Sequence, residues 1–166
     1  MVKTKYLFIA ALIVIVGIVM AISAFPSEER RVKKRFRLLS ECVSKSTEEN
    51  GLTMLQRMKE IGSLFDAQCE LKVPDQSLSG SYTREEISTY AGSARSQASQ
   101  LDLKFYDLRV AFPEKGVAKV TLTARLTGQS AAGERMDETR ELECLLKKIE
   151  KKWLFSQIEV IEVLKK

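Results

Sequence analysis

The polar residues best placed for chemistry are a carboxylate and a guanidinium two positions apart, Glu138 and Arg140. Both continue, backwards along the chain, the apolar alternation of a predicted strand, so their side chains are expected to point inward. An enclosed carboxylate can act as a general base, and a neighbouring donor can stabilise an oxyanion. Asp107, Tyr90 and Tyr106 are weaker candidates for the same pocket. These five residues would support proton transfer on a small substrate.

Each candidate also has a structural interpretation. Glu138 and Arg140 can lie beyond the core at the end of a hairpin and pair with each other. Tyr90 can belong to the core with its hydroxyl at the rim, and Asp107 can occupy an irregularity in a strand. The sequence leaves both interpretations open.

Residue content excludes several other chemistries. The chain contains no histidine, so a histidine-based catalytic triad cannot form. Its three cysteines, Cys42, Cys69 and Cys144, lack the paired spacing of zinc and redox sites. The sequence has neither of the common phosphate-binding glycine loops and no G-x-S-x-G nucleophile turn. We therefore predict no metal and no cofactor.

Two states of the cysteines are compatible with the sequence. Free cysteine behaves as a small buried hydrophobic residue, so three packed thiols are one state. A disulfide between Cys69 and Cys144 is the other, if the domain lies in an oxidising compartment.

The elements that must position the candidate residues are four segments of alternating apolar and polar residues between positions 101 and 164. They predict a four-stranded antiparallel meander. The apolar period lengthens from two to three after Phe105 and again after Phe155. Such a step predicts a β-bulge, at Tyr106–Asp107 and after Phe155, because otherwise the later side chains would turn to the opposite face. Two bulges would curl the sheet around a tapering cavity.

Three helices are predicted before the meander, at Ser27–Ser46, Leu52–Phe65 and Thr83–Ser99. Asn50 and Gly51, after the first helix, are suited to a left-handed cap. The residues expected to face the core are Val32, Phe36, Leu39 and Val43 in the first helix, Leu52, Leu55, Met58, Ile61 and Phe65 in the second, and Ile87, Tyr90, Ala91, Ala94 and Ala98 in the third.

The third helix is predicted to begin at a capping box, Thr83–Glu86. A short strand, Asp66–Val73, and a loop, Pro74–Ser81, precede it. The predicted fold class is therefore α+β, with a curved four-stranded antiparallel sheet and one short strand packed against three N-terminal helices.

An apolar segment precedes this layer. Tyr6–Ala24 contains no charged residue, and as a helix it would span about 28 Å, close to the hydrocarbon thickness of a bilayer. It predicts that residues 1–26 are a transmembrane anchor in contact with lipid and that residues 27–166 form the domain. A cleavable signal peptide, with weak cleavage sites near Ser23, is the alternative.

The side of the membrane is left open. Two basic residues precede the apolar segment and six follow it, which favours a cytoplasmic domain. A short basic start followed at once by an apolar run is typical of an export signal. We favour a single-pass protein of the inner (cell) membrane with its domain on the extracytoplasmic side.

The positive charge of the chain is concentrated near its N-terminus. The net charge is +5, but residues 38–166 carry 19 basic and 20 acidic side chains. A nucleic-acid-binding face needs clustered lysine and arginine on the folded domain. We therefore predict no nucleic-acid partner.

This order of elements, ending in a strand that contains Lys152-Trp153-Leu154-Phe155, resembles the nuclear transport factor 2-like superfamily. That superfamily includes the SnoaL-type polyketide cyclases and the ketosteroid isomerase-like proteins, and the resemblance covers about residues 28–164. It implies a cone-shaped, cystatin-like α+β fold. Its enzymes use a pocket carboxylate or histidine as general base with a tyrosine or second acid. No such pair is matched in this chain, so the resemblance implies fold more than activity.

The expected function is a membrane-anchored, non-catalytic domain that binds a small apolar ligand or a partner protein at the bacterial envelope. The alternative is a small isomerase, dehydratase or cyclase with Glu138 or Asp107 as base. The resemblance also implies a homodimer through the outer face of the sheet, where Thr121, Thr123 and Arg125 form a polar, β-favouring surface.

Overall fold

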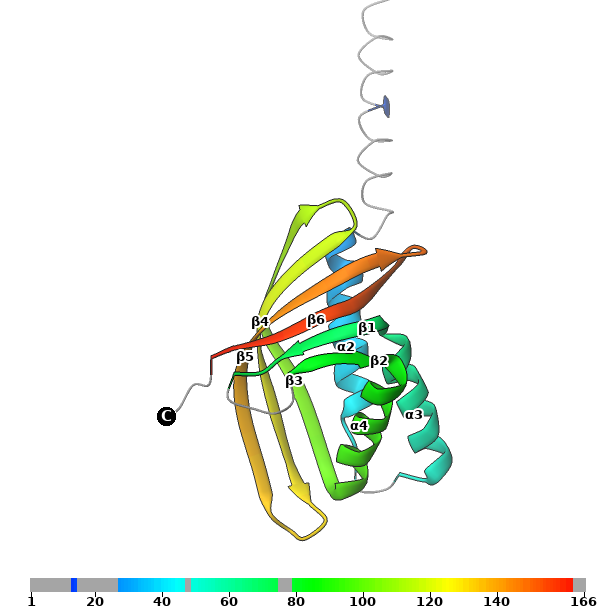
Figure 1. The fold of residues 1–166 in the computed structure, drawn as a ribbon, viewed down its shortest axis with the longest axis vertical. Helices are drawn as coiled ribbons and strands as arrows, with labels where there is room; N and C mark the ends of the chain where they lie inside the picture. Colours follow the sequence, from blue (N-terminus) through cyan, green and yellow to red (C-terminus); the bar gives the residue numbers. More distant parts are fainter. Residues whose placement is uncertain (1–12, 15–26, 47–48, 75–78, 163–166) are drawn as a thin grey trace, which may run out of the picture. The chain divides into compact units, whose positions relative to one another are not determined.

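The computed structural model describes residues 13–14, 27–46, 49–74 and 79–162. Backbone contacts divide the chain into two compact units, residues 1–31 and 32–166. From residue 27 onward the elements are α2 (Glu28–Val43), α3 (Gly51–Ser63), β1 (Phe65–Lys72), β2 (Gly80–Thr83), α4 (Arg84–Gln97), β3 (Ala98–Glu114), β4 (Val117–Ser130), β5 (Arg135–Ile149) and β6 (Lys152–Glu162) (Figure 1). The buried core lies entirely in the second unit.

The predicted membrane anchor, Tyr6–Ala24, lies outside the described residues except for Ile13 and Val14, which are helical. In the part of the chain that the structure describes, no helix is both long and apolar enough to cross a bilayer. The anchor and its signal-peptide alternative therefore stay predictions from the sequence.

The sheet has six strands in the order β2-β1-β6-β5-β4-β3. Neighbouring strands are antiparallel except β1 and β6, which pair in parallel. The predicted meander is confirmed as β3 to β6, and the predicted short strand as β1. The sequence does not predict β2, because this segment of 4 residues is too short to show an alternating pattern. It forms by pairing with β1, where Tyr82 lies opposite Cys69.

Both predicted bulges are confirmed. In β3 the pairing with β4 slips between Tyr106 and Arg109, and Asp107 there has a φ of 55°. In β6 the pairing with β5 slips between Phe155 and Gln157. Bulges increase the local twist and bend the strand that carries them. The long strands of the meander accordingly curve in Figure 1.

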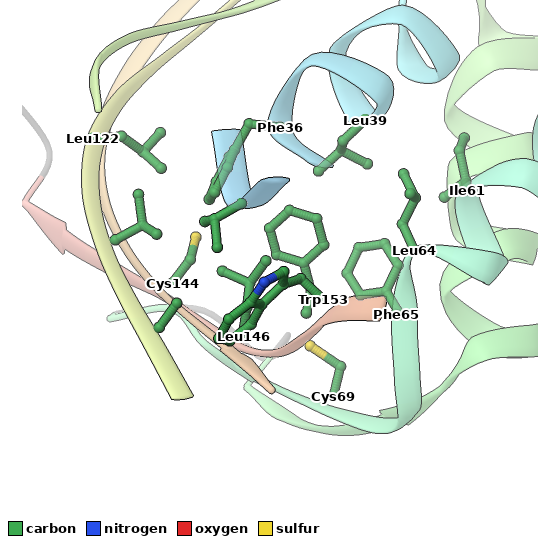
Figure 2. Packing of buried hydrophobic residues seen from close by; sticks show 14 of the residues in the cluster. Phe36, Leu39, Ile61, Leu64, Phe65, Cys69, Leu122, Cys144, Leu146 and Trp153 are labelled. Carbon is green, nitrogen blue, oxygen red and sulfur yellow. The ribbon is translucent and has the colours of Figure 1, made fainter. Parts of the chain in front are cut away.

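Helix α2 fills the concave side of the sheet. Figure 2 shows the packing of its side chains, among them Phe36, against residues of the strands. The Phe36 ring lies edge-on to Phe105 and Phe155, with ring centroids 5.5 and 4.9 Å apart. The core consists of Val32, Phe36, Leu39, Cys42, Ile61, Leu64, Phe65, Cys69, Ala118, Val120, Leu122, Ala124, Cys144, Leu146, Trp153 and Phe155. These side chains pack in the space between α2 and the sheet, where the sequence predicts a tapering cavity, and that cavity stays a prediction.

The start of α3 differs from the prediction. Asn50 is an extended N-cap residue with a φ of −83°, and its side chain accepts a hydrogen bond from the Thr53 amide at 2.8 Å. The predicted left-handed cap at Asn50 and Gly51 is wrong, because these residues begin α3 instead of ending α2. Leu52 and Leu55, expected in the core, are 78% and 65% exposed. Only the C-terminal part of α3 reaches the core.

The capping box of α4 is confirmed. The Thr83 hydroxyl accepts from the Glu86 amide at 3.2 Å, and the Glu86 carboxylate accepts from the Thr83 amide at 2.8 Å. The predicted buried face is partly wrong, since Tyr90 and Ala94 are exposed and Gly92 is buried. The cause is close packing on α3, where a Cβ at Gly92 would come within 2.5 Å of a methionine side chain.

Candidate functional site

The C-terminal end of α2 is hydrogen-bonded to the outer edge of β3. The Ser40 hydroxyl donates to the Leu103 carbonyl, and the Ser44 hydroxyl accepts from the Leu103 amide at 3.0 Å. The main chains of Lys45 and Leu101 exchange two hydrogen bonds, 2.7 and 3.0 Å long. Part of an edge strand that would otherwise expose unpaired main-chain groups is thereby covered.

Beyond these contacts α2 and β3 leave an open groove with a volume of about 410 Å³. The groove is lined by Lys33, Phe36, Arg37 and Ser40 from α2 and by Lys104, Phe105, Tyr106 and Leu108 from β3. Ligand sites are typically concave and largely apolar, with a few well-placed polar groups. This groove has that composition, and we take it as the candidate functional site.

The floor of the groove is apolar. Phe36 is buried, and Phe105 and Leu108 are half-buried. The two phenylalanines also contact each other edge to face, which fixes the orientation of both rings. A flat or flexible apolar group of a ligand could therefore pack on this floor without rearrangement of the two rings.

The rim of the groove is cationic. Lys33 and Arg37 are exposed and lie about one helical turn apart on α2, while Lys104 lies on β3. The Lys104 ammonium is 2.7 Å from the Asp102 carboxylate, and this hydrogen bond raises the pKa of Lys104. None of the lining residues is acidic. The groove is therefore suited to an anion.

Main-chain groups of β3 also face the groove. In an antiparallel pair, alternate residues direct their N–H and C=O groups away from the partner strand. Leu101 and Leu103 direct theirs toward α2, as their hydrogen bonds show. Phe105 is the next residue in this alternation, so its N–H and C=O groups are expected on the same side. They would offer one donor and one acceptor close to the cationic rim.

The first two candidate pocket residues lie elsewhere. Glu138 and Arg140 are on β5, and their side chains form an ion pair of 2.9 Å. The Glu138 side chain is 62% exposed, and neither residue lines the groove. Arg140 pairs in register with Ala124, which is the last buried residue of β4. The two charged residues thus lie at the margin of the core.

The other three candidates lie at three different places in the structure. Tyr106 is 43% exposed and lines the groove. Tyr90 is 58% exposed, and its ring packs edge-on against Tyr82 at 5.7 Å. Asp107 lines a different hollow of the sheet together with Arg109, Thr121, Thr123 and Glu141. Of the predicted site residues, the structure therefore places only Tyr106 at the groove.

The three cysteines are free and buried. Burial raises the pKa of the Cys69 thiol from its ordinary value of 9.0 to about 12, and it also raises the pKa of Cys144. β6 lies between β1 and β5, so the Cα atoms of Cys69 and Cys144 are two strand spacings apart, about 9 to 10 Å. A disulfide needs less than about 7 Å. The packed-thiol interpretation holds, and the disulfide alternative is wrong for this arrangement.

One buried cation is missing from the sequence-based prediction. Arg95 is 1% exposed and is the only buried charged residue in the described part of the chain. Its Nη1 atom donates to the carbonyl oxygens of Cys42, Val43 and Ser44 at 2.6, 2.7 and 2.9 Å, and its Nη2 atom donates to Glu49. These hydrogen bonds satisfy main-chain carbonyl groups at the C-terminal end of α2, which have no partner within the helix. Arg95 is thus a structural residue.

Apart from Tyr106, the polar residues that line the groove are also missing from the sequence-based prediction. From the sequence, the basic residues of α2 bear only on the side of the membrane and on nucleic-acid binding. The available signal is the four-residue spacing of Lys33 and Arg37, which places them on one side of the apolar stripe. Only the tertiary structure shows that β3 lies beside this side of α2.

Across residues 13–14, 27–46, 49–74 and 79–162, no three histidine, cysteine, aspartate or glutamate residues are grouped so that they could hold an ion. The groove itself offers cations and no carboxylate. Its chemistry is that of anion binding.

No described protein family and no curated protein sequence matches this chain. Solved structures do match it. A protein described as a scytalone dehydratase from Novosphingobium aromaticivorans DSM 12444 is 15% identical with a TM-score of 0.61, over 80% of this chain and 82% of that one. A hexachlorocyclohexane dehydrochlorinase, LinA type 2, is 10% identical with a TM-score of 0.63, over 80% and 83%.

A calcium/calmodulin-dependent protein kinase II association domain from Xanthomonas campestris is also similar, at 14% identity and a TM-score of 0.61, over 81% of this chain and 86% of that one. At these identities a match shows the fold and leaves activity open. The structural neighbours have SnoaL-type, nuclear transport factor 2-like folds. The folded part of this chain therefore has the nuclear transport factor 2-like α+β fold.

Proposed function

We propose that this protein is a non-catalytic binding protein that holds a small amphipathic anion in the groove between α2 and β3. The observation that carries the proposal is the lining of the groove, with an apolar floor, Lys33 and Arg37 on α2, Lys104 on β3 in an ion pair with Asp102, and no acidic residue among the lining itself. Removal of an apolar body from water on such a floor contributes roughly 25 cal/mol per Å². Charge-assisted hydrogen bonds at the rim would orient the anionic end.

An isomerase, dehydratase or cyclase is the alternative function. The scytalone dehydratase and the dehydrochlorinase among the similar structures support it at the level of the fold. Such an enzyme needs a general base within reach of its substrate. The groove is lined by no carboxylate, and the described core buries no charged residue except Arg95. These observations favour binding without catalysis.

A fluorescent amphipathic anion, anilinonaphthalene sulfonate, tests the binding proposal. Residues 27–166 contain the complete core and are used for the titration. We expect one saturable site, weakened at least tenfold by Arg37→Glu. The matched control is Lys34→Glu, which changes the same charge on an exposed residue of α2 that does not line the groove. Equal effects of both variants, or the absence of saturation, would count against the groove.

The membrane anchor is part of the proposal and is supported by the apolar run Tyr6–Ala24 alone. It would hold the domain at the inner membrane, and we keep the extracytoplasmic side as the prediction. Resistance of the full chain to extraction by alkaline carbonate tests the anchor. Cleavage of a tag after Lys166 by protease added to intact cells tests the side.

A homodimer through the outer face of the sheet is a further part of the proposal. Thr121 and Thr123 are half-buried there, while Arg125 is engaged with Asp137 through two hydrogen bonds of 2.9 and 2.7 Å. The threonines are therefore the better contact residues. Sedimentation equilibrium of residues 27–166 tests the dimer, and a monomer at high concentration would contradict it.

A further inference from the structure

We infer that the anion held between α2 and β3 is the phosphate of an anionic membrane glycerophospholipid, with one acyl chain lying on the apolar floor. This inference rests on the proposed function and names the source of its ligand. It is carried by the form of the groove, by the charge of α2 and by the length of chain that precedes the groove.

The groove is open along the molecular surface. A volume of about 410 Å³ between α2 and β3 can take part of an acyl chain without enclosing it. Phe36, Phe105 and Leu108 provide the apolar contact for that part of the chain. The rest of the lipid would stay outside, in its bilayer, which an enclosed cavity would not allow.

Cations line the groove from α2 and from β3, and the one on β3 is paired with the Asp102 carboxylate. Lys33 and Arg37 are on α2, and Lys104 is on β3. A guanidinium can donate two parallel hydrogen bonds to a phosphate, and a lysine ammonium binds it as a point charge. The Phe105 N–H would add a main-chain donor beside them. A phosphate diester offers two non-ester oxygens, which share one negative charge, and two ester oxygens to this set of donors.

The charge around the groove favours a membrane as the source. Residues 30–37 contain six basic side chains and no acidic one. Clusters of four to eight lysines and arginines immediately on the cytoplasmic side of a membrane-spanning segment are typical of sites for anionic lipids. On the extracytoplasmic side, which we predict for this domain, the cluster requires anionic lipid in that leaflet. A soluble ligand with one charge would need only the cations that contact it, so it would not account for the other basic side chains of residues 30–37.

The length of chain before the groove keeps it near the bilayer. Eight residues lie between Ala24, the end of the apolar run, and Lys33. Even when fully extended, such a segment covers no more than about 31 Å. An inserted anchor would therefore hold the groove within that distance of the headgroups, where the effective concentration of lipid is high.

Native mass spectrometry of the full chain, released from nonionic detergent, tests the inference. Three probes are titrated separately: dioctanoylphosphatidylglycerol, dioctanoylphosphatidylcholine and decanoate. We expect phosphatidylglycerol to bind at one site at least tenfold more tightly than either of the others. Arg37→Ala and Lys104→Ala should each weaken that binding roughly fivefold, as expected for the loss of one basic contact. Lys34→Ala should leave it unchanged.

The outcomes separate the inference from the proposed function. If decanoate binds as tightly as phosphatidylglycerol and shows the same dependence on Arg37, the groove binds anions but the lipid inference is overturned. If phosphatidylcholine binds as tightly, recognition of an anionic lipid is likewise overturned. If no probe binds, or Lys34→Ala weakens binding as much as Arg37→Ala, both proposals fail. Circular dichroism of each variant checks that these exposed substitutions leave the fold intact.

Discussion

Arg95 caps α2, the helix that Lys45 follows, and Lys45 caps α4, the helix that contains Arg95. The guanidinium of Arg95, near the end of α4, lies 2.6 Å from the carbonyl oxygen of Cys42 in the last turn of α2. Lys45 follows α2, and its ammonium donates to the carbonyls of Arg95 and Ala98 at 2.9 and 2.8 Å. Basic side chains at helix C-termini satisfy carbonyl groups and oppose the negative end of the helix dipole. The exchange joins the ends of α2 and α4.

Replacement of Arg95 by methionine should lower the free energy of unfolding by about 3 to 5 kcal/mol, because Glu49 and several buried carbonyls would lose their donor. Urea denaturation of residues 27–166 measures this change. The control is Arg57→Met, which removes an arginine whose ion pair with Glu60 is largely exposed. That variant should lose less than about 1 kcal/mol. Equal losses would mean that the reciprocal caps contribute little.

Alanine at Gly128 should lower the free energy of unfolding by about 2 kcal/mol or more. A Cβ at this position in β4 would fall on the main-chain oxygen of Gln100, so the two strands would have to move apart. Gly51→Ala is the matched change, because no atom lies within 4 Å of its Cβ position and the residue starts α3. It should stabilise the protein by up to about 1 kcal/mol. Thermal unfolding of both variants compares them, and destabilisation by Gly51→Ala alone would contradict the prediction.

The stability of the domain should fall as pH rises from about 9 to 12. The pKa of Cys69 is raised from 9.0 to about 12 in the folded state, so in this range the unfolded chain loses a thiol proton that the native chain keeps. The stabilisation that comes from the protonated Cys69 thiol is complete below pH 9 and is lost toward pH 12. Urea denaturation at several pH values should therefore give a shallower decline for Cys69→Ala than for the natural sequence.

The control for the pH experiment is the reactivity of the thiols. All three cysteines are buried, so the native protein should not react with an aromatic disulfide reagent at pH 8, whereas the unfolded protein should release three equivalents. Rapid reaction of a thiol in the native state would show that it is accessible, and the pH prediction would then lose its basis.

Valine at Asp107 should lower the free energy of unfolding by about 1 to 2 kcal/mol, because a β-branched residue adopts a positive φ only with strain. Glycine at the same position should be neutral or stabilising, since it adopts this conformation freely. Arg109→Val, at a neighbouring exposed position whose backbone is extended, should change stability by less than about 0.5 kcal/mol. Thermal unfolding ranks the variants, and a neutral Asp107→Val would mean that the bulge can move.

Local chemistry in the sequence predicted much of the fold. The capping box at Thr83 acts through atoms three residues apart, so neighbouring residue types suffice to locate it. The bulges at Asp107 and after Phe155 follow from a two-residue period that must stay in phase with one core. β2 and the N-cap at Asn50 were less accessible, because a short strand depends on its partner and asparagine is suited to both ends of a helix.

The sequence by itself determined the alternating strands, the apolar stripe of α2, the basic cluster beside it and the apolar run Tyr6–Ala24, because each is a periodic or compositional property of one segment. Tertiary structure decided that α2 fills the concave face, that Glu138 and Arg140 pair at its margin, and that Lys104 lies across a groove from Arg37. Periodicity identifies which face of a segment is buried. It does not say which segment covers that face or where the cover ends, and the groove exists because α2 covers only part of the edge of β3.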